Sequence, residues 1–241
     1  MGAADGVPKG LPDELEYGPG GLAVLYAEEN TRDSLFAAMQ RREAYATSGT
    51  RPIVRFFGGW DYHKDACSAA DMVAQGYAHG VPMGGDLASP SKGQTAPRFI
   101  VSALADTGTA EYPGNPLQRI QLIKGWYQDG ELQETVLDVA GGDNNASVDI
   151  NTCETSGTGH AQLCSVWQDN DFNPGAQAFY YTRVLENPSC RWSQRICADA
   201  GVRCENPASI PEGMENCCSA DHNKVIQERA WSSPIWYTPQ A

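Results

Sequence analysis

Two carboxylates near the start of this 241-residue chain are the first side chains whose position could support chemistry. Glu28 and Glu29 follow a short apolar run, and Asn30 or Thr31 comes next as a candidate helix cap. A carboxylate at the end of such a strand could contact a metal ion or a substrate. Glu29 could equally lie beside a helix N-terminus because the helix dipole favours a negative charge there, and this simpler interpretation is preferred.

Charged and aromatic side chains elsewhere form a second set of candidates. Glu228 and Arg229 form a charged pair beside Trp231, which could bind a ligand or, more simply, hold the last strand in place. An aromatic platform for a carbohydrate or an organic acid would consist of Trp60, Tyr62, Trp126, Tyr127, Trp192 and Trp231. Metal-free catalysis by Glu28, Glu29 or Glu186 has the least support because nothing pairs these carboxylates. The residues expected to face a ligand are Glu28, Glu29, Trp60, Glu228, Arg229 and Trp231.

The eight cysteines predict disulfides rather than a zinc site. They are Cys67, Cys153, Cys164, Cys190, Cys197, Cys204, Cys217 and Cys218. Their spacing lacks the tight C-x2-4-C knuckles of structural zinc sites. Cys153 and Cys164 bracket a loop rich in Gly, Ser and Thr, so we expect them to pair, whereas the other pairings stay open. Disulfides are typical of a periplasmic or secreted protein, whose export signal would lie outside this chain.

The four histidines show no spacing typical of a metal site. His63, His79, His160 and His222 lie in separate polar or Gly-rich segments. H-x-H, H-E-x-x-H, G-x-S-x-G and P-loop patterns are absent from the sequence. We therefore assign no catalytic residue, no cofactor-binding residue and no metal ligand in this chain, and we expect no cofactor in it.

The charge of the chain excludes two classes of partner. Its 17 Lys and Arg against 30 Asp and Glu give a formal net charge of −13. Nucleic-acid binding and docking on anionic membranes both depend on clustered positive charge, so neither is expected. No apolar run approaches the ~20 residues that a membrane span needs.

Apolar patterns predict a mainly β chain with one substantial helix. The helix is expected over residues 31–43, with the turn residues Asp129-Gly130 joining two strands into a hairpin. Expected strands cover residues 22–27, 53–57, 99–104, 120–126, 132–139, 178–185 and 235–237. Residues 58–97, 141–177 and 187–224 are expected to be irregular, the last as a Cys-rich loop. The predicted fold is an antiparallel β-sandwich-like domain over 51–241, preceded by a loop and one β-α unit in 1–50.

Several long segments together resemble one protein family. They are Asn30–Met39 (NTRDSLFAAM), Tyr45–Gly49 (YATSG), Val54–Asp61 (VRFFGGWD), Gly80–Leu87 (GVPMGGDL), Phe179–Glu186 (FYYTRVLE) and Gln227–Tyr237 (QERAWSSPIWY). In this order, over about residues 22–239, they resemble the C-terminal part of the bacterial "domain of unknown function 3604" family. That family is similar to the polymerase-and-histidinol-phosphatase (PHP) metallohydrolases.

The resemblance implies a distorted β/α barrel with a metal site, followed by a β-rich region. Residues 22–50 would be the closing β-α unit of that barrel, and 51–241 the appended β domain. A divalent metal, zinc or manganese, is implied for the full-length family, and its H-x-H and D-T-H motifs are absent here. The chain is then expected to be a fragment or a free-standing derivative, from a family whose members are often exported.

Two functions from different classes follow. The first is an accessory C-terminal region of a metal-dependent, PHP-like hydrolase that is inactive alone. Its partner would be the missing N-terminal barrel, or a second copy bound through the 31–43 helix face with Leu35, Phe36 and Met39. The alternative is a stand-alone, non-catalytic β-sandwich module that binds a carbohydrate or another small ligand.

Overall fold

The computed structural model describes residues 20–239, in which two large β-sheets, two short two-stranded sheets (β9 with β10 and β13 with β14) and three α-helices are found. The eight-stranded sheet contains β1 (Leu22–Leu25), β2 (Ala44–Thr47), β5 (Asp86–Leu87), β7 (Leu117–Gln128), β8 (Glu131–Gly141), β12 (Ala178–Glu186), β15 (Arg229–Ser232) and β16 (Ile235–Tyr237). The four-stranded sheet has the order β11 (Gln162–Gln168), β6 (Arg98–Leu104), β3 (Ile53–Gly59), β4 (Gly80–Pro82). All pairs within these sheets are antiparallel except β5 with β16.

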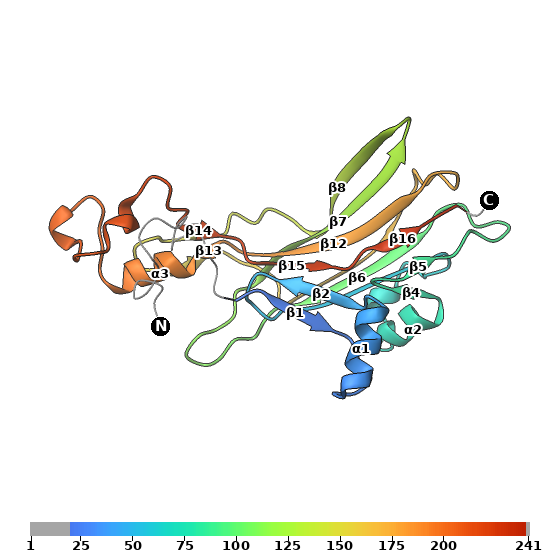
Figure 1. Ribbon diagram of the computed structural model, residues 1–241, viewed down its shortest axis with the longest axis horizontal. Coiled ribbons are helices and arrows are strands. Elements are labelled where there is room, and N and C mark those ends of the chain that lie inside the picture. Colours follow the sequence, from blue (N-terminus) through green and yellow to red (C-terminus); the bar gives the residue numbers. More distant parts are fainter. Residues whose placement is uncertain (1–19, 240–241) are drawn as a thin grey trace.

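The two sheets face each other around one hydrophobic core (Figure 1). Phe56 on β3 and Phe99 on β6 are buried against residues of the larger sheet, and the ring of Phe99 lies 4.2 Å from that of Tyr180. Alternate residues of β12, such as Tyr180 and Val184, point into this core, as expected for a half-buried strand. The predicted mainly antiparallel β architecture is confirmed.

The β7–β8 hairpin projects from the sandwich (Figure 1), and its register shifts once, between Ile120 and Gln121. Its turn residues Asp129 and Gly130 have φ angles of 53° and 89°. Positive φ at both central residues matches the right-handed twist of the paired strands. The predicted hairpin is therefore confirmed, with strands longer than the sequence pattern indicated.

Residues 22–47 form a strand, a helix and a second strand that returns beside the first. Helix α1 (Arg32–Gln40) begins after Thr31, whose hydroxyl accepts from the Ser34 backbone N–H. It ends earlier than predicted because Arg42 adopts a left-handed φ of 58°. β1 pairs antiparallel with β2, and β2 pairs in turn with β15. Segments on both sides of residue 50 therefore share one sheet, and β1 and β2 lack the parallel pairing of barrel strands.

Some elements lie where the sequence predicted irregular structure. Helix α2 (Met72–Ala78) covers the outer face of the small sheet, where Gly76 lets it approach the Phe57 ring closely. Strand β11 lies within the predicted polar loop, and helix α3 (Trp192–Asp199) within the Cys-rich segment. The remaining short elements are η1 (Ala66–Ser68), β9 (Ser147–Val148), β10 (Thr155–Ser156), β13 (Ser189–Cys190), η2 (Pro207–Ser209), η3 (Glu215–Cys218) and β14 (Val225–Ile226). Residues 1–19, predicted as a loop, lie outside the described residues.

The predicted pairing of Cys153 with Cys164 is wrong. Cys153 bonds to Cys190, and Cys164 bonds to Cys67. The reason is tertiary: Cys164 belongs to β11 and faces η1 on the outside of the small sheet, far from the loop that carries Cys153.

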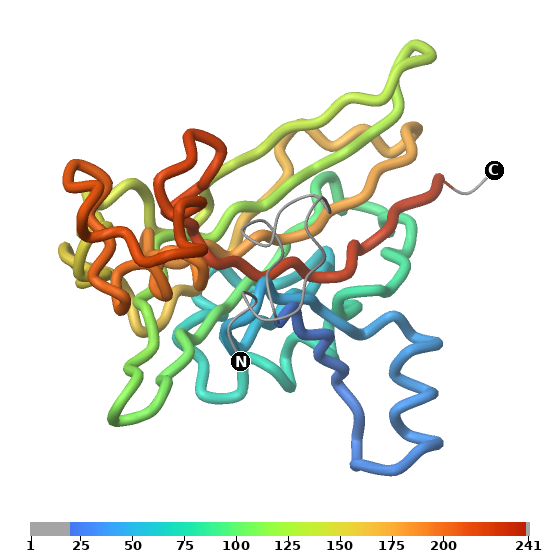
Figure 2. Tube along the Cα trace, turned by 60° about the vertical axis from the view of Figure 1, so that its left-hand side comes forward, coloured from blue at the N-terminus to red at the C-terminus, as the bar shows by residue number. Residues whose placement is uncertain are grey.

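Two further disulfides, Cys197–Cys217 and Cys204–Cys218, cross-link the Cys-rich segment, which extends beyond one end of the sandwich (Figures 1 and 2). All eight cysteines lie in the described part of the chain and none is free, which confirms extensive oxidation. Four disulfides are typical of an oxidising environment such as the periplasm or the extracellular space.

Candidate functional site

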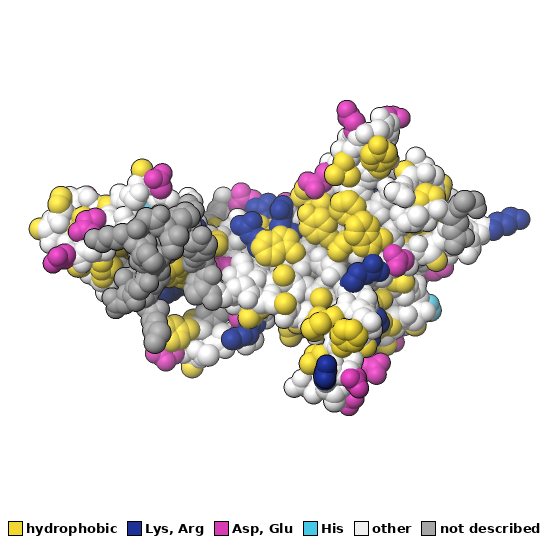
Figure 3. Space-filling model, viewed as in Figure 1, with side chains coloured by type: hydrophobic (Ala, Val, Ile, Leu, Met, Phe, Trp, Pro, Cys, Tyr) yellow, Lys and Arg dark blue, Asp and Glu magenta, His cyan; other side chains and the backbone are white. Residues whose placement is uncertain are grey.

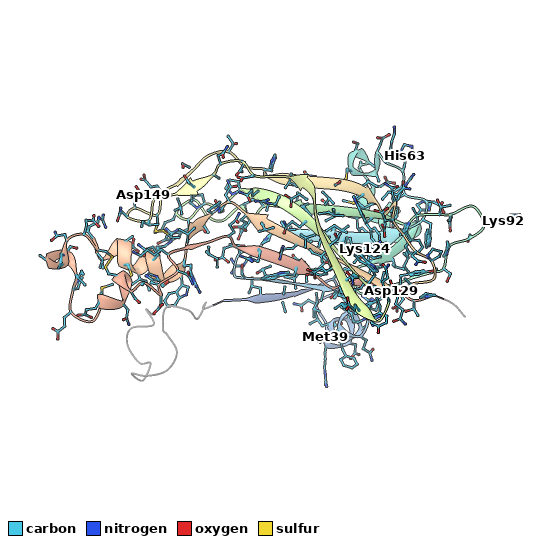
Figure 4. The ribbon with its side chains drawn as sticks, turned by 90° about the horizontal axis from the view of Figure 1, so that it is seen from above. Met39, His63, Lys92, Lys124, Asp129 and Asp149 are labelled. Atoms are coloured by element: carbon cyan, nitrogen blue, oxygen red, sulfur yellow. A yellow bond between two sulfur atoms is a disulfide. The ribbon has the colours of Figure 1, made fainter. Side chains whose placement is uncertain are left out.

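A cavity of about 340 Å³ opens between the β7–β8 hairpin and the loop that follows β11. We call it the aromatic cavity. Its lining residues are Lys124, Trp126, Gln128, Thr135, Leu137, Trp167, Asp169, Asp171, Phe172, Asn173, Ala176, Ala178 and Tyr180. Figure 4 shows Lys124 in the body of the sandwich, with Asp129 marking the tip of the hairpin. The cavity therefore lies where the two sheets diverge and the hairpin leaves the body.

A buried polar triad forms one side of the aromatic cavity. Lys124 Nζ lies 2.6 Å from Asp169 Oδ2, and it donates to the Asp171 carbonyl oxygen at 3.2 Å. The Tyr180 hydroxyl donates to the same Asp169 oxygen at 2.6 Å. Burial, reinforced by the Asp169 charge, raises the pKa of Tyr180, so the phenol keeps its proton and acts as a donor. The triad pairs its two charges inside the protein, as buried ions require.

Aromatic rings form the other sides of the cavity, and neighbours hold them from behind. Trp167 lies 6.0 Å from the core ring of Phe99. Phe172 makes edge-to-face contacts with Trp60 and Tyr237, with centroids 5.3 Å and 4.8 Å apart. Packing of this kind fixes the orientation of side chains before any ligand arrives.

A second concave surface, of about 490 Å³, lies where β1, α1, β3 and α2 meet. We call it the arginine hollow, and its lining residues are Tyr26, Ala27, Glu28, Arg41, Glu43, Arg55 and Tyr77. Glu28 stands on the exposed rim at the end of β1. The hollow thus brings together side chains from four elements, and Glu28, which the sequence had singled out, lies at its edge.

Glu43 is the buried carboxylate of the arginine hollow, and both of its oxygens already have a partner within the chain. Glu43 accepts a hydrogen bond from the Tyr77 hydroxyl, and Arg41 Nη2 lies 3.5 Å from its other oxygen. The Arg55 guanidinium lies 3.5 Å over the Tyr26 ring and donates to the Tyr77 hydroxyl at 3.3 Å. Among residues 20–239, no carboxylate forms an ion pair with Arg55.

Both phenols of the arginine hollow have a pKa above the usual value of a tyrosine. Burial raises the pKa of Tyr26, and the Arg55 charge opposes that rise. Burial also raises the pKa of Tyr77, and the contact with Glu43 adds to it. Neutral phenols beside a cation that lacks a carboxylate partner leave the hollow able to accept an anionic group.

A third feature is the carboxyl of Glu186 at the end of β12, which is 1% exposed. Neither of its oxygens makes a hydrogen bond of good geometry to a described residue, although the Thr50 hydroxyl lies close by. Burial raises the pKa of Glu186 to about 7, and the charges of Glu228 and Asp106 add to the rise, whereas Thr50 lowers it. The carboxyl is therefore largely protonated below neutral pH.

The structure separates the residues that the sequence predicted to face a ligand. Glu29 accepts from the Thr31 hydroxyl at 3.3 Å, beside the start of α1, as the simpler interpretation expected. Trp60 donates to the Ala88 carbonyl oxygen at 2.9 Å and supports Phe172 from behind. Of these two residues, Trp60 contributes to the aromatic cavity only indirectly, and Glu29 lines neither the aromatic cavity nor the arginine hollow.

The charged pair near the C-terminus is distributed over separate contacts. Glu228 accepts from the Ser48 hydroxyl, while Arg229 Nε donates to the Gln227 carbonyl oxygen. The Arg229 guanidinium lies 6.0 Å over the ring of Trp231. The contact of Glu228 with Ser48 joins β15 to the segment after β2, whereas the two Arg229 side-chain contacts stay within its own segment, so the motif has a structural role here.

The predicted aromatic platform is not assembled as one surface. Of its six members, only Trp126 lines the aromatic cavity, and Tyr62 is buried beneath α2. Sequence reasoning missed the triad, although one signal was available: Lys124 interrupts the apolar run from Ile120 to Trp126. A lysine inside a buried strand needs a partner, and here Asp169 is that partner.

The described residues do not fit a divalent metal ion. No three His, Cys, Asp or Glu side chains of residues 20–239 come together as a possible ligand set. His222 is buried, and its ring bonds to the Ser193 hydroxyl and the Cys217 carbonyl oxygen. No chemical step is therefore assigned to a metal held by these residues.

Comparison with known proteins establishes the family. The model of the family described as "Protein of unknown function (DUF3604)" matches residues 9–239, so the chain belongs to the DUF3604 family. No curated protein and no solved structure matches the chain. Among the described helices, none is long and apolar enough to cross a membrane.

Proposed function

We propose that the chain is an accessory C-terminal region of a metal-dependent, PHP-like hydrolase of the phosphoesterase type, inactive by itself. Its role is to cover the mouth of the catalytic barrel and to form part of the substrate pocket. The arginine hollow is the observation that carries this proposal, because it places Arg55 beside the strand end that bears Glu28. In the proposed enzyme, zinc or manganese belongs to the barrel, and residues 22–50 lie next to it.

Arg55 is the group of the hollow that suits an anionic substrate. Its guanidinium is planar, permanently charged and stacked over the Tyr26 ring. Among residues 20–239, no carboxylate forms an ion pair with it. A guanidinium presents N–H donors in the geometry of phosphate oxygens and stabilises charge on them. Glu43 does not pair with Arg55, because its carboxylate already forms an ion pair with Arg41 and accepts a hydrogen bond from the Tyr77 hydroxyl.

Helix α1 supplies the surface that would contact the barrel. Phe36 and Met39 are 59% and 57% exposed, and Figure 3 shows apolar side chains over this helix. The helix is continuous with Arg41 of the hollow, so an element covering its apolar face would also border the hollow. We commit to the catalytic barrel as that element, and we expect the chain alone to self-associate through the same face.

The proposed role is tested on the chain alone by two measurements, which are the rate of phosphate-ester hydrolysis and the binding of an anion. An aryl phosphate incubated with the chain and manganese or zinc is expected to hydrolyse at the rate without protein. Calorimetric titration with phenyl phosphate is expected to show weak, saturable binding that Arg55→Gln abolishes and Glu28→Gln strengthens. Arg195→Gln, an exposed arginine on α3, is the matched control and leaves binding unchanged.

Two results would contradict the proposed role. Metal-dependent turnover that survives repurification would mean that the chain carries its own active site. Phenyl phosphate binding that is absent, or equally strong in Arg55→Gln, would remove the hollow as a substrate-facing surface. Self-association is checked by size-exclusion chromatography with light scattering, where Phe36→Ser with Met39→Ser is expected to give monomers.

A stand-alone binding module remains the second candidate function. The observation in its favour is separate from the hollow: it is the aromatic cavity, which has the lining of a small-molecule site. A periplasmic or secreted location suits either function, because the four disulfides would persist in such an oxidising compartment.

A further inference from the structure

The aromatic cavity combines aromatic walls with a pre-formed polar side. We propose that it binds one neutral sugar ring, either free or at the end of a longer saccharide. The inference gives the second candidate function its ligand class and does not depend on the hydrolase role. Its volume of about 340 Å³ lies at the lower end of the ~300–1,000 Å³ typical of small-molecule sites.

The walls offer flat apolar surfaces to a ring-shaped ligand. Trp126, Trp167 and Phe172 line the cavity from three separate segments of the chain. A sugar ring has C–H groups on its faces and hydroxyls on its edge, so its faces pack on aromatic rings while its edge meets polar groups. This lining favours a ring that is apolar on its faces and polar around its edge.

The walls are held in place before a ligand arrives. Phe172 is fixed between Trp60 and Tyr237, and the Tyr237 hydroxyl donates to the Pro174 carbonyl oxygen at 2.8 Å. The Asp169 backbone N–H donates to the Pro97 carbonyl oxygen at 3.0 Å, which anchors the start of the same loop. A pre-organised site loses little conformational entropy on binding, which favours small ligands with few contacts.

The polar groups match the hydroxyls of a sugar. An ammonium carries three N–H donors. Lys124 uses two of them within the described chain, one toward the Asp169 carboxylate and one toward the Asp171 carbonyl oxygen. Because Lys124 lines the cavity, the third is the one left for a ligand hydroxyl. Thr135 and Asn173 add a hydroxyl and an amide to the lining, so donors and acceptors are both present.

The charges of the cavity select against ions. An aromatic cage often binds an ammonium ion, but here Lys124 Nζ already lies 5.2 Å over the Trp126 ring and 6.0 Å over the Tyr180 ring. A second cation would meet this ammonium, and an anion would meet the carboxylates of Asp169 and Asp171. A neutral ligand avoids both repulsions.

The experiment measures tryptophan fluorescence and calorimetric heat with three probe classes. The neutral probes are the methyl glycosides of glucose, galactose and mannose, with cellobiose and maltose as longer saccharides. Choline is the cationic probe, and glucuronate is the anionic one. The variants are Trp126→Ala, which removes one wall, and Thr135→Val, which removes a hydroxyl at nearly constant volume. Tyr127→Ala is the matched control, because this neighbouring side chain is outside the lining of the cavity.

The expected result is saturable binding of at least one neutral saccharide by the wild type. Trp126→Ala is expected to weaken it at least tenfold and Thr135→Val severalfold, whereas Tyr127→Ala leaves it unchanged. Choline and glucuronate are expected to bind at least tenfold more weakly than the neutral probe. Failure of every neutral saccharide to bind, tighter binding of a charged probe, or equal binding by Trp126→Ala would each overturn the inference. Because phenyl phosphate and Arg55 are not involved, neither outcome decides the proposed hydrolase role.

Discussion

Replacement of the buried Glu186 by glutamine should change how stability depends on pH. The pKa of this carboxyl rises from its usual 4.5 to about 7 in the folded chain, chiefly because of burial. A difference of about 2.5 pKa units corresponds to about 3 kcal/mol of unfolding free energy, since each unit is worth ~1.4 kcal/mol. Glutamine has the same shape without the ionisation, so Glu186→Gln removes this contribution.

The sign of the Glu186 effect follows from the raised pKa. A folded state with the higher pKa holds the proton more tightly, so the contribution of the protonated carboxyl is fully present below about pH 4.5. It is lost as the pH rises through about 7, where the ionised group meets the charges of Glu228 and Asp106 and forms no ion pair with a cation of residues 20–239. Glu186→Gln should therefore match the wild type near pH 4.5 and exceed its stability by up to about 3 kcal/mol at pH 8.5.

Urea unfolding of the disulfide-intact protein, followed by tryptophan fluorescence, measures the Glu186 effect. The quantity compared is the difference in unfolding free energy between Glu186→Gln and the wild type, because contributions of other titrating groups cancel in it. Glu131→Gln, at the exposed start of β8, is the control and should show no pH-dependent difference. A Glu186→Gln difference that is the same at pH 4.5 and pH 8.5 would refute the argument from burial.

Two further predictions concern the triad and the disulfides. Asp169→Asn leaves the Lys124 ammonium buried without its counter-charge and should lower the unfolding free energy by about 3–5 kcal/mol in urea titrations; a loss below about 1 kcal/mol would contradict the pairing. Cys153→Ser should free Cys190 rather than Cys164, which thiol labelling with peptide mapping identifies. The same change opens a loop of 37 residues and should cost about 4 kcal/mol in the chain-entropy model.

Local sequence patterns predicted the elements whose structure depends on local chemistry. Asp129 and Gly130 tolerate positive φ, so the hairpin could be placed without knowledge of the rest of the chain. Helix α2 could not be predicted because it has only seven residues and includes Gly76, and its stability comes from packing on Phe57. Strand β11 is partly polar in sequence and is defined by its pairing with β6.

The candidate sites were predictable only at single positions. Glu28 was identified from its place after a short apolar run, but Arg55 and Tyr77 reach the same hollow through tertiary packing. Likewise, Lys124 stands out within an apolar run, whereas Asp169 becomes its partner only when β7 and the loop after β11 come together. Disulfide pairing follows the same rule, because cysteine spacing does not encode which strands become neighbours.

The most direct measurement of the central claim, that the arginine hollow faces an anionic substrate, is a nuclear magnetic resonance titration of the chain with phenyl phosphate. The side-chain Nε–H signals of the arginines are followed as the ligand is added. The account predicts a saturable shift of the Arg55 signal, a smaller one for Arg41, and none for Arg195 on the Cys-rich segment. An unmoved Arg55 signal, or shifts of equal size at all three arginines, would contradict it.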